Sequence, residues 1–331
     1  MSETQFRALV IEETEPKKFV SSIKTRSLDE LPAGEVLVRV HYSALNYKDA
    51  LSSVGNRGVT RNYPHTPGVD ASGVVAASDD PQFATGDEVL VTSYDLGMNT
   101  DGGLGEYIRV PAAWVVKLPA QMSLKQAMMF GTAGLTAGLM IDVLVNNGVK
   151  PEQGPVLVTG ATGGVGSLAV AILAKAGFEV AAVTGKADAA DFLKSLGATQ
   201  VVSRESVIDT KRPMLKEQWA GVVDVVGGDM LASALKGIRY GGTATCAGLV
   251  GSPELNTSVF PFILRGISLV GIDSAECPMA PRVAVWNRLA GEWKPDCLAS
   301  LTTEITLEEV ETRLAALLQG KAQGHYVVKM A

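Results

Sequence analysis

A cluster of glycines between two apolar runs is the first feature of this chain whose residue types suggest chemistry. Four glycines fall close together: Gly160, Gly163, Gly164 and Gly166. The apolar run 156–158 before them is typical of a buried strand, and the run 168–176 after them is typical of a buried helix. Glycine lets the backbone turn tightly, and the N–H groups that begin a helix attract an anion. With a second strand at 179–184, the pattern predicts a βαβ unit that binds the pyrophosphate of a dinucleotide. The alternative is a glycine turn that only packs helix on strand.

The end of the second strand indicates which dinucleotide is bound. An NAD-binding unit usually carries an acidic residue there, which holds the ribose hydroxyls. This chain has Thr184, Gly185 and Lys186 instead. A small hydroxyl, a glycine and a cation suit a 2′-phosphate, so we predict NADPH as the cofactor. Alternatively, Lys186 is a solvated lysine that opens the next helix.

Composition restricts the classes of protein to consider. The 331 residues, 47% of them hydrophobic, are enough for two domains with sizeable cores. A net charge of −6 with scattered basic residues argues against a nucleic-acid-binding protein. The three cysteines are dispersed, which argues against a disulfide framework, and no metal-ligand spacing is present. The N-terminus lacks the pattern of a secretory signal, and the apolar run 127–141 is too short to span a membrane, so we expect a cytoplasmic protein.

The order of predicted elements indicates two domains. Short strands separated by Gly/Pro turns fill residues 1–122, which predicts a compact β-rich domain. A long helical region then follows Ser123, and six strands alternate with helices up to residue 274, one of the helices being expected at 214–219. This alternation predicts a doubly wound parallel sheet with both faces covered. The tail from residue 275 is expected to return to the first domain.

These parts, in this order, resemble the medium-chain dehydrogenase/reductase superfamily. The landmarks are Asn46-Tyr-Lys-Asp49, the stretches 67–73 and 86–89, and the glycine turn. Within the superfamily, NYKDALSSVG, GTAGLTA, VTGATGGVG, VFPFILRG and VGIDS resemble the zinc-free quinone-oxidoreductase branch and, within it, the acryloyl-CoA reductase group. The resemblance implies an α/β fold with a GroES-like catalytic domain at 1–122 and 275–331. It places a Rossmann domain that binds NADPH at 123–274.

Two departures from other dehydrogenases narrow the chemistry. The zinc alcohol dehydrogenases of this superfamily have a cysteine ligand where this chain has Asn46, and a histidine where it has Val69. We therefore predict no metal. The glycine pattern also fits the short-chain dehydrogenases, but that family needs a Tyr-x-x-x-Lys pair downstream. Tyr240 and Tyr326 are followed four positions later by Ala244 and Met330, so that interpretation fails.

The resemblance also implies the reaction, in which a hydride passes from NADPH to the β-carbon of an activated C=C bond. The protein must then hold the alkene, polarise its conjugated carbonyl and exclude water. Tyr47 is the first catalytic candidate, because a phenol can donate to a developing enolate or to the cofactor; the alternative is a core tyrosine. Asn46 and Asp49 either orient Tyr47 or cap the following helix, and capping is the expected role of Asp49.

The remaining site residues follow from the same resemblance. Those expected at the cofactor are Tyr47, Thr162, Gly163, Gly164, Val165, Thr184, Gly185, Lys186, Arg204, Leu249, Ile263 and Ser274. Thr162–Val165 would lie at the pyrophosphate and Arg204 would be a second cation at the 2′-phosphate, although it could be a plain surface charge. Arg57 and Arg61 are candidates for the rim that meets the phosphates of coenzyme A, or they only keep a loop soluble.

Three functions are consistent with these residues. The leading one is NADPH-dependent reduction of a small 2-enoyl-CoA, acryloyl-CoA to propanoyl-CoA. The second is reduction of quinones or other conjugated carbonyls. The third is a non-enzymatic NADPH-binding protein that senses redox state. The family commonly pairs the edges of its sheets at the sixth strand, here 268–272, so a homodimer is expected.

Overall fold

The computed structural model describes residues 4–322 and 324–330. Its chain divides into two compact units. Unit 1 holds the described residues of Met1–Thr132, Ala275–Val283 and Thr302–Ala331, and unit 2 holds Ala133–Ser274 and Ala284–Leu301. The chain passes from one unit to the other at four points, two of which lie inside helices α2 and α8, whose bounds are given below.

Unit 1 is built mainly on antiparallel strands, with one parallel pair. Its seven-stranded sheet has the order β14-β15-β3-β4-β5-β7, with β6 paired to β3, and β1 and β2 form a separate antiparallel hairpin. The strands are β1 (Gln5–Glu15), β2 (Lys18–Ser27), β3 (Val36–Ala44), β4 (Asp70–Ser78), β5 (Glu88–Thr92), β6 (Tyr107–Val110), β7 (Val116–Lys117), β14 (Thr302–Thr306) and β15 (His325–Lys329). The β-rich, GroES-like fold predicted for this part of the chain is confirmed.

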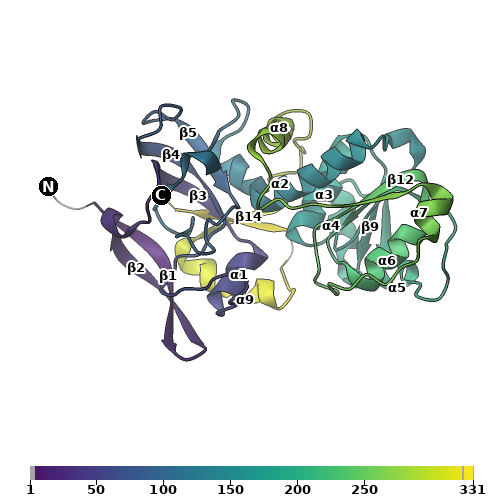
Figure 1. Ribbon diagram of the computed structural model, residues 1–331, viewed down its shortest axis with the longest axis horizontal. Coiled ribbons are helices and arrows are strands. Elements are labelled where there is room, and N and C mark those ends of the chain that lie inside the picture. The colour runs from purple at the N-terminus through teal and green to yellow at the C-terminus, as the bar shows by residue number, and fades with distance from the viewer. Residues whose placement is uncertain (1–3, 323, 331) are drawn as a thin grey trace. The chain divides into compact units, whose positions relative to one another are not determined.

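Strand β3 is the centre of unit 1 because it pairs with β4, β6 and β15. Its alternating sequence places Val36, Val38 and Val40 in the core, as the period of two predicts. Helices α1 (Tyr47–Ser53) and α9 (Val310–Leu318) pack against each other next to the hairpin (Figure 1). Strand β2 is not among the predicted elements, since its half-exposed residues lack a clear alternation.

Unit 2 contains a six-stranded parallel sheet of order β10-β9-β8-β11-β12-β13. Its strands are β8 (Val156–Val158), β9 (Val180–Thr184), β10 (Gln200–Ser203), β11 (Trp219–Asp224), β12 (Ile238–Cys246) and β13 (Ser268–Gly271). Every residue of β8, β9 and β11 is buried, as expected where helices cover both faces of a sheet. The direction in which strands are added reverses between β8 and β11, so the doubly wound Rossmann fold is confirmed.

The helices follow from local sequence signals. Those of unit 2 are α3 (Gly164–Lys175), α4 (Ala190–Ser195), α5 (Arg204–Val207), α6 (Gly228–Lys236) and α7 (Phe260–Arg265). Helix α2 (Leu124–Asn146) begins at Ser123, whose Oγ accepts a hydrogen bond from the Gln126 N–H. It is broken at Gly131, which has φ +53° and ψ −157°. Helix α2 is long and apolar enough to cross a membrane, but 83% of its most apolar window is buried, which is typical of a core helix. Helix α8 (Met279–Ala290) completes the set.

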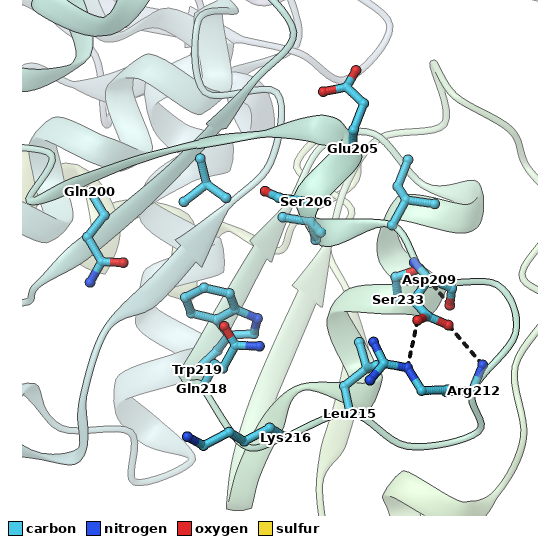
Figure 2. A pocket seen from close by; sticks show the side chains of 13 residues that line it. Gln200, Glu205, Ser206, Asp209, Arg212, Leu215, Lys216, Gln218, Trp219 and Ser233 are labelled. Carbon is cyan, nitrogen blue, oxygen red and sulfur yellow. Dashed lines mark hydrogen bonds and ion pairs between the residues drawn. The ribbon is translucent and has the colours of Figure 1, made fainter.

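The helix expected at 214–219 does not form, so this prediction is wrong. Leu215 and Gln218 instead donate their N–H groups to the carbonyls of Lys236, the last residue of α6, and of Gly237, and β11 begins at Trp219. Without a helix there, a hollow of about 500 Å³ remains between β10 and this segment. Figure 2 shows the residues that line the hollow, among them Trp219 and the Asp209–Arg212 ion pair.

Candidate functional site

The glycine turn of unit 2 is shaped by two close approaches of its own backbone. Gly160 has φ +58°, a conformation that favours glycine. A Cβ on Gly166, in the first turn of α3, would lie only 2.2 Å from the Gly160 carbonyl oxygen. The N–H of Gly163 donates to that same oxygen at 3.0 Å. The first turn of α3 therefore lies directly against the end of β8, which gives the turn the form expected of a phosphate cradle.

Asp224, a residue that the sequence analysis missed, holds this turn from the neighbouring strand. It ends β11, and its Oδ1 accepts a 2.6 Å hydrogen bond from the hydroxyl of Thr159, at the end of β8. Its Oδ2 accepts the N–H of Gly227 at 2.8 Å. Burial raises the pKa of the Asp224 carboxyl. The point where the strand order reverses is thus fixed by one buried carboxylate, whose only sequence signal is its place at the end of an apolar strand.

The residues predicted at the 2′-phosphate lie together at the ends of β9 and β10, which pair Thr184 with Ser203. The Thr184 hydroxyl accepts the N–H of Lys186 at 3.0 Å. The Arg204 guanidinium packs on Gly185, and a Cβ there would lie 3.2 Å from its Cζ and Nε. Within residues 4–322 and 324–330, no carboxylate forms an ion pair with Arg204. Gly185 therefore makes room for the exposed Arg204 guanidinium at the edge of the sheet. Lys186, the next residue after Gly185, precedes the following helical turn.

Three further predicted cofactor residues come from the other half of the sheet. Leu249 follows β12 and Ile263 lies on α7, and both side chains are largely exposed, at 68% and 72%. Ser274 follows β13, and its Oγ accepts a hydrogen bond of 2.7 Å from Thr136. Thr162–Val165, in contrast, belong to the glycine turn itself. Unit 2 thus carries every predicted cofactor residue except Tyr47.

In unit 1, the turn that carries Asn46 and Tyr47 is built around the carboxylate of Asp49. Its Oδ2 accepts the N–H of Asn46 at 2.7 Å, so Asp49 caps α1 as expected. Its Oδ1 accepts the N–H groups of Gly68 and Val69, each at 3.0 Å. Burial raises the pKa of Asp49 to about 7 against these three hydrogen bonds, and the charge of Asp70 adds to the rise. This carboxyl is therefore poised to change charge near neutral pH.

The side chain of Asn46 bonds to a second buried carboxylate, that of Asp70. Asn46 Nδ2 donates to Asp70 Oδ2 at 2.7 Å, and the Thr132 hydroxyl donates to Asp70 Oδ1 at the same distance. The Thr132 hydroxyl also lies 2.8 Å from that of Ser93, which has a left-handed backbone with φ +62°. Burial raises the pKa of Asp70 as well. The result is a buried polar network that fixes the Asn46 amide.

Tyr47 projects from this network instead of joining it. The residue is 46% exposed, and its hydroxyl makes no hydrogen bond to any residue that the structure describes. It is therefore not a core tyrosine with a locally satisfied hydroxyl. The arrangement offers one accessible phenol beside an amide and two carboxyls that hold the backbone in place.

Arg57 and Arg61 are both exposed, but their guanidinium groups differ. That of Arg57 pairs with Glu13 of the hairpin, donates to the carbonyl of Arg61 and lies over the rings of Phe19 and Tyr63. The side chain of Arg61 makes no ion pair within the described part of the chain. Arg57 thus fastens its loop to the hairpin, whereas the side chain of Arg61 is exposed.

The same two domains recur in known proteins. The family model described as "Alcohol dehydrogenase GroES-like domain" matches residues 32–120, and the one described as "Zinc-binding dehydrogenase" matches residues 164–286. The chain is 50% identical to "Putative quinone oxidoreductase YhfP" of Bacillus subtilis over 99% of both chains. It belongs to the quinone-oxidoreductase branch of the medium-chain dehydrogenase/reductase family.

Other relatives of the family are similarly close. "Acrylyl-CoA reductase AcuI" of Ruegeria pomeroyi is 46% identical over 98% of both chains. The yhdH oxidoreductase of Salmonella enterica, solved in complex with NADP, has a TM-score of 0.95 and 44% identity, covering 99% of this chain and 100% of its own. The Bacillus subtilis protein yhfP, solved with NAD bound, has a TM-score of 0.96 and 50% identity, covering 98% and 99%.

Although one of the matching family models is named for zinc, the residues of this chain do not fit a catalytic zinc ion. Asn46 uses its amide N–H to bond Asp70, and Val69 is a buried apolar residue without a donor atom. Among the described residues, His, Cys, Asp and Glu side chains form no group of three that could hold a metal. We therefore derive no step through zinc.

Proposed function

We propose that this protein reduces the C=C bond of a small 2-enoyl-CoA with NADPH, and that acryloyl-CoA, which would become propanoyl-CoA, is its substrate. The observation that carries the proposal is the 46% identity to an acrylyl-CoA reductase over nearly the full length of both chains. The fixed Asn46 amide beside the accessible Tyr47 hydroxyl supports it. In this proposal unit 1 is the catalytic domain and unit 2 is the cofactor domain, so residues 123–132 fall in the catalytic domain and residues 284–301 in the cofactor domain.

NADPH is the cofactor that the residues of unit 2 suit. The first turn of α3 offers N–H groups to a pyrophosphate, and Arg204 and Lys186 offer positive charge to a 2′-phosphate. Structures of relatives that are 42% and 44% identical were solved with NADPH and NADP, in agreement with the prediction, whereas the 50% identical relative was solved with NAD. When bound, NADPH supplies the hydride for the β-carbon of the substrate.

The residues of unit 1 hold and polarise the substrate in this proposal. The Tyr47 hydroxyl donates a hydrogen bond to the thioester carbonyl, whose oxygen gains negative charge as the β-carbon is reduced. The Asn46 amide keeps the backbone before Tyr47 in place because Asp70 and Asp49 fix its side chain and its N–H. Leu249 and Ile263 supply apolar surface on the nicotinamide side.

A phosphate of coenzyme A would be met by Arg61. Its charge is exposed and has no carboxylate partner among the described residues, in contrast to Arg57, which is bound to Glu13. Arg57 then contributes indirectly, by holding the carbonyl of Arg61. Replacing Arg61 with Gln should raise the KM for an enoyl-CoA but leave that for a simple quinone unchanged.

A quinone or another conjugated carbonyl is the second candidate substrate. The observation that favours it is the name of the relative with 50% identity, a quinone oxidoreductase. The same hydroxyl could polarise a quinone carbonyl, and no recognition of coenzyme A would then be needed.

We also propose a cytoplasmic homodimer. Strand β13 is the edge of its sheet, so its backbone can pair with a second copy. Large apolar side chains are exposed on the segment just before this strand, at Val259, Phe260 and Leu264. A monomeric mass measured by light scattering would contradict the dimer.

One assay separates the candidate functions, namely NADPH oxidation with acryloyl-CoA, crotonyl-CoA, a simple quinone and no acceptor. A strong preference for acryloyl-CoA supports the proposal. Turnover of the quinone alone supports the second candidate. Tight NADPH binding without turnover of any acceptor would instead indicate a non-enzymatic NADPH-binding protein.

A further inference from the structure

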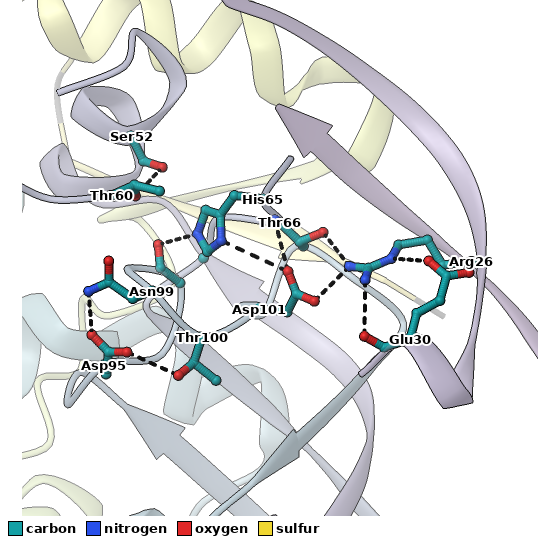
Figure 3. Close-up of polar contacts among 12 residues, drawn as sticks. Arg26, Glu30, Ser52, Thr60, His65, Thr66, Asp95, Asn99, Thr100 and Asp101 are labelled. Atoms are coloured by element: carbon teal, nitrogen blue, oxygen red, sulfur yellow. Dashed lines mark hydrogen bonds and ion pairs between the residues drawn. The ribbon is translucent and has the colours of Figure 1, made fainter. Parts of the chain in front are cut away.

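A second polar cluster of unit 1 lies outside the candidate site and ties the hairpin to the loop 95–102. Arg26, on β2, donates from Nη1 to Asp101 Oδ2 at 2.8 Å and to the Thr66 hydroxyl at 3.2 Å. It also donates from Nε to Glu30 Oε2 at 3.1 Å. The side chains of Arg26 and Asp101 are only 15% and 17% exposed. Figure 3 shows the Arg26 guanidinium between these partners.

The cluster grips the start of one short segment, residues 65–69, which we call the strap. Asp101 Oδ1 accepts the N–H of Thr66 at 3.1 Å. The Thr66 carbonyl accepts the N–H of Gly102 at 2.7 Å. His65 is buried, and its Nε2 lies 2.9 Å from the carbonyl oxygen of Gly97 (Figure 3). The Asp101 side chain and the backbone of the loop 95–102 therefore hold the start of the strap in place.

The other end of the strap is the part that holds Asp49. The N–H groups of Gly68 and Val69 are two of the three donors to that carboxylate. The backbone has little room to move there, because a Cβ on Gly97 or Gly102 would lie 2.4 Å from the Gly68 backbone. A shift of the strap at Thr66 would therefore be transmitted to the two amides that face Asp49.

We propose that Arg26 and Asp101 are positioning residues for the turn that carries Asn46 and Tyr47, acting through the strap on Asp49. Among the described residues, neither side chain forms a hydrogen bond or an ion pair with residues 46–49. Their effect passes from the Asp101 carboxylate to Thr66 N–H, along the strap to Gly68 and Val69, and from there to Asp49 and the N–H of Asn46. The inference rests on the proposed function only for its activity readouts.

An exposed ion pair on the same hairpin provides the matched control. Lys24, also on β2, pairs with Glu12 at 2.6 Å, and the two side chains are 43% and 38% exposed. This pair joins the two hairpin strands and does not touch the strap. Lys24→Gln therefore removes an ion pair from β2 while leaving the strap in place, and its removal should cost little.

The test compares Arg26→Gln, Asp101→Asn, Arg26→Lys and Lys24→Gln with the unmodified protein by hydrogen exchange and by the pH profile of kcat. In Arg26→Gln and Asp101→Asn, we expect about tenfold faster exchange in peptides covering residues 65–69 and 46–50. We also expect an upward shift of the pH limb that reports Asp49, since its carboxylate loses hydrogen bonds. The charge of Asp70 also raises the pKa of Asp49, and the charge of Arg282 in turn lowers that of Asp70. Arg26→Lys should restore part of both effects, and Lys24→Gln should show neither.

The result that overturns the proposal is exchange in Arg26→Gln and Asp101→Asn that rises only in the hairpin, with residues 65–69 and 46–50 unchanged. A uniform rise across unit 1 would also overturn it, since that would indicate general destabilisation. Failure of the proposed function is detected separately, because the hydrogen-exchange result does not depend on which acceptor the protein reduces. If the protein turned over no acceptor at all, the exchange result would still test the role of Arg26 and Asp101.

Discussion

The two turns that carry the candidate site are built in opposite ways. In unit 2, Gly160–Gly166 presents backbone N–H groups, and its geometry depends on the absence of a Cβ atom at Gly160 and Gly166. In unit 1, the turn at Asn46 depends on side chains. The buried carboxylates of Asp49 and Asp70 accept hydrogen bonds from the backbone N–H and the side-chain amide of Asn46. The first arrangement suits a site that binds a negative charge. The second suits a site that must hold a hydroxyl and an amide in fixed positions without a metal.

The electrostatics of the turns differ accordingly. Two buried carboxyls with raised pKa values lie at the unit 1 turn, whereas unit 2 has one, Asp224, at its glycine turn. The exposed cation of unit 2, Arg204, lies at the sheet edge. We therefore expect substitutions in unit 2 to change cofactor binding, and those in unit 1 to change turnover and its pH dependence.

The largest effect is expected from Gly166→Ala. The added Cβ would lie 2.2 Å from the Gly160 carbonyl oxygen, so α3 must move away from β8. We expect a loss of about 5 kcal/mol in the free energy of unfolding and no measurable NADPH binding. Thermal unfolding and fluorescence titration with NADPH check both.

Gly163→Ala is the matched control for the same turn. Its Cβ would lie 3.4 Å from that oxygen, an ordinary contact, in a backbone conformation that alanine adopts. It should keep the stability of the protein while weakening NADPH, whose pyrophosphate needs the space. Equal stability losses in the two variants would contradict this account of the turn.

Unit 1 is expected to show two opposing pH effects on stability. The pKa of Asp49 is raised to about 7, so its contribution is complete below about pH 4 and is lost as pH rises through 7, a change of about 4 kcal/mol. Burial lowers the pKa of His325 to about 4, so its contribution is complete above about pH 6.5 and is lost as pH falls through 4, about 3 kcal/mol.

Single variants separate these two effects. The difference in the free energy of unfolding between variant and unmodified protein should favour Asp49→Asn most above pH 7. For His325→Asn the same difference should favour the variant most below pH 4. Denaturant unfolding from about pH 3 to about pH 9 measures both differences. A difference that does not change with pH would show that the residue in question does not titrate in this range.

A smaller effect, on turnover, is expected from Asp70→Asn. The neutral amide removes the charged acceptor of the Asn46 and Thr132 hydrogen bonds, so kcat should fall about 10- to 100-fold. The dissociation constant of NADPH should stay within about twofold, since the turn of unit 2 is untouched. Weakened NADPH binding with unchanged kcat would reverse the roles that we assign to the two turns.

The smallest effect is expected from Arg204→Ala. Removing one exposed cation from the 2′-phosphate site should weaken NADPH about tenfold and leave NADH unchanged. Lys186→Asp should weaken NADPH relative to NADH further, because the new carboxylate would repel the negatively charged 2′-phosphate. Isothermal titration with both cofactors measures the ratio, and equal weakening of NADPH and NADH would remove these residues from cofactor selection.

The difference between the two turns also explains what the sequence could predict. The glycine turn and the buried strands around it are local patterns, so the Rossmann fold followed from spacing alone. The Asp70–Thr132 bond joins residues 62 positions apart, and no local period reveals it. The failed helix at 214–219 has the same cause, since Leu215 and Gln218 donate to the carbonyls of Lys236 and Gly237, at the end of α6. The ion pair of Arg57 with Glu13 could not be predicted for the same reason. Glu13 lies 44 residues away, on the hairpin whose second strand was not predicted.

The central claim is that unit 2 holds NADPH while unit 1 directs reduction to the β-carbon of an enoyl-CoA. It is tested most directly by following deuterium from NADPH labelled at the transferable C4 position during turnover of acryloyl-CoA. The account predicts propanoyl-CoA with one deuterium at C3 and a solvent proton at C2. Deuterium at C2, or unlabelled product, would contradict it.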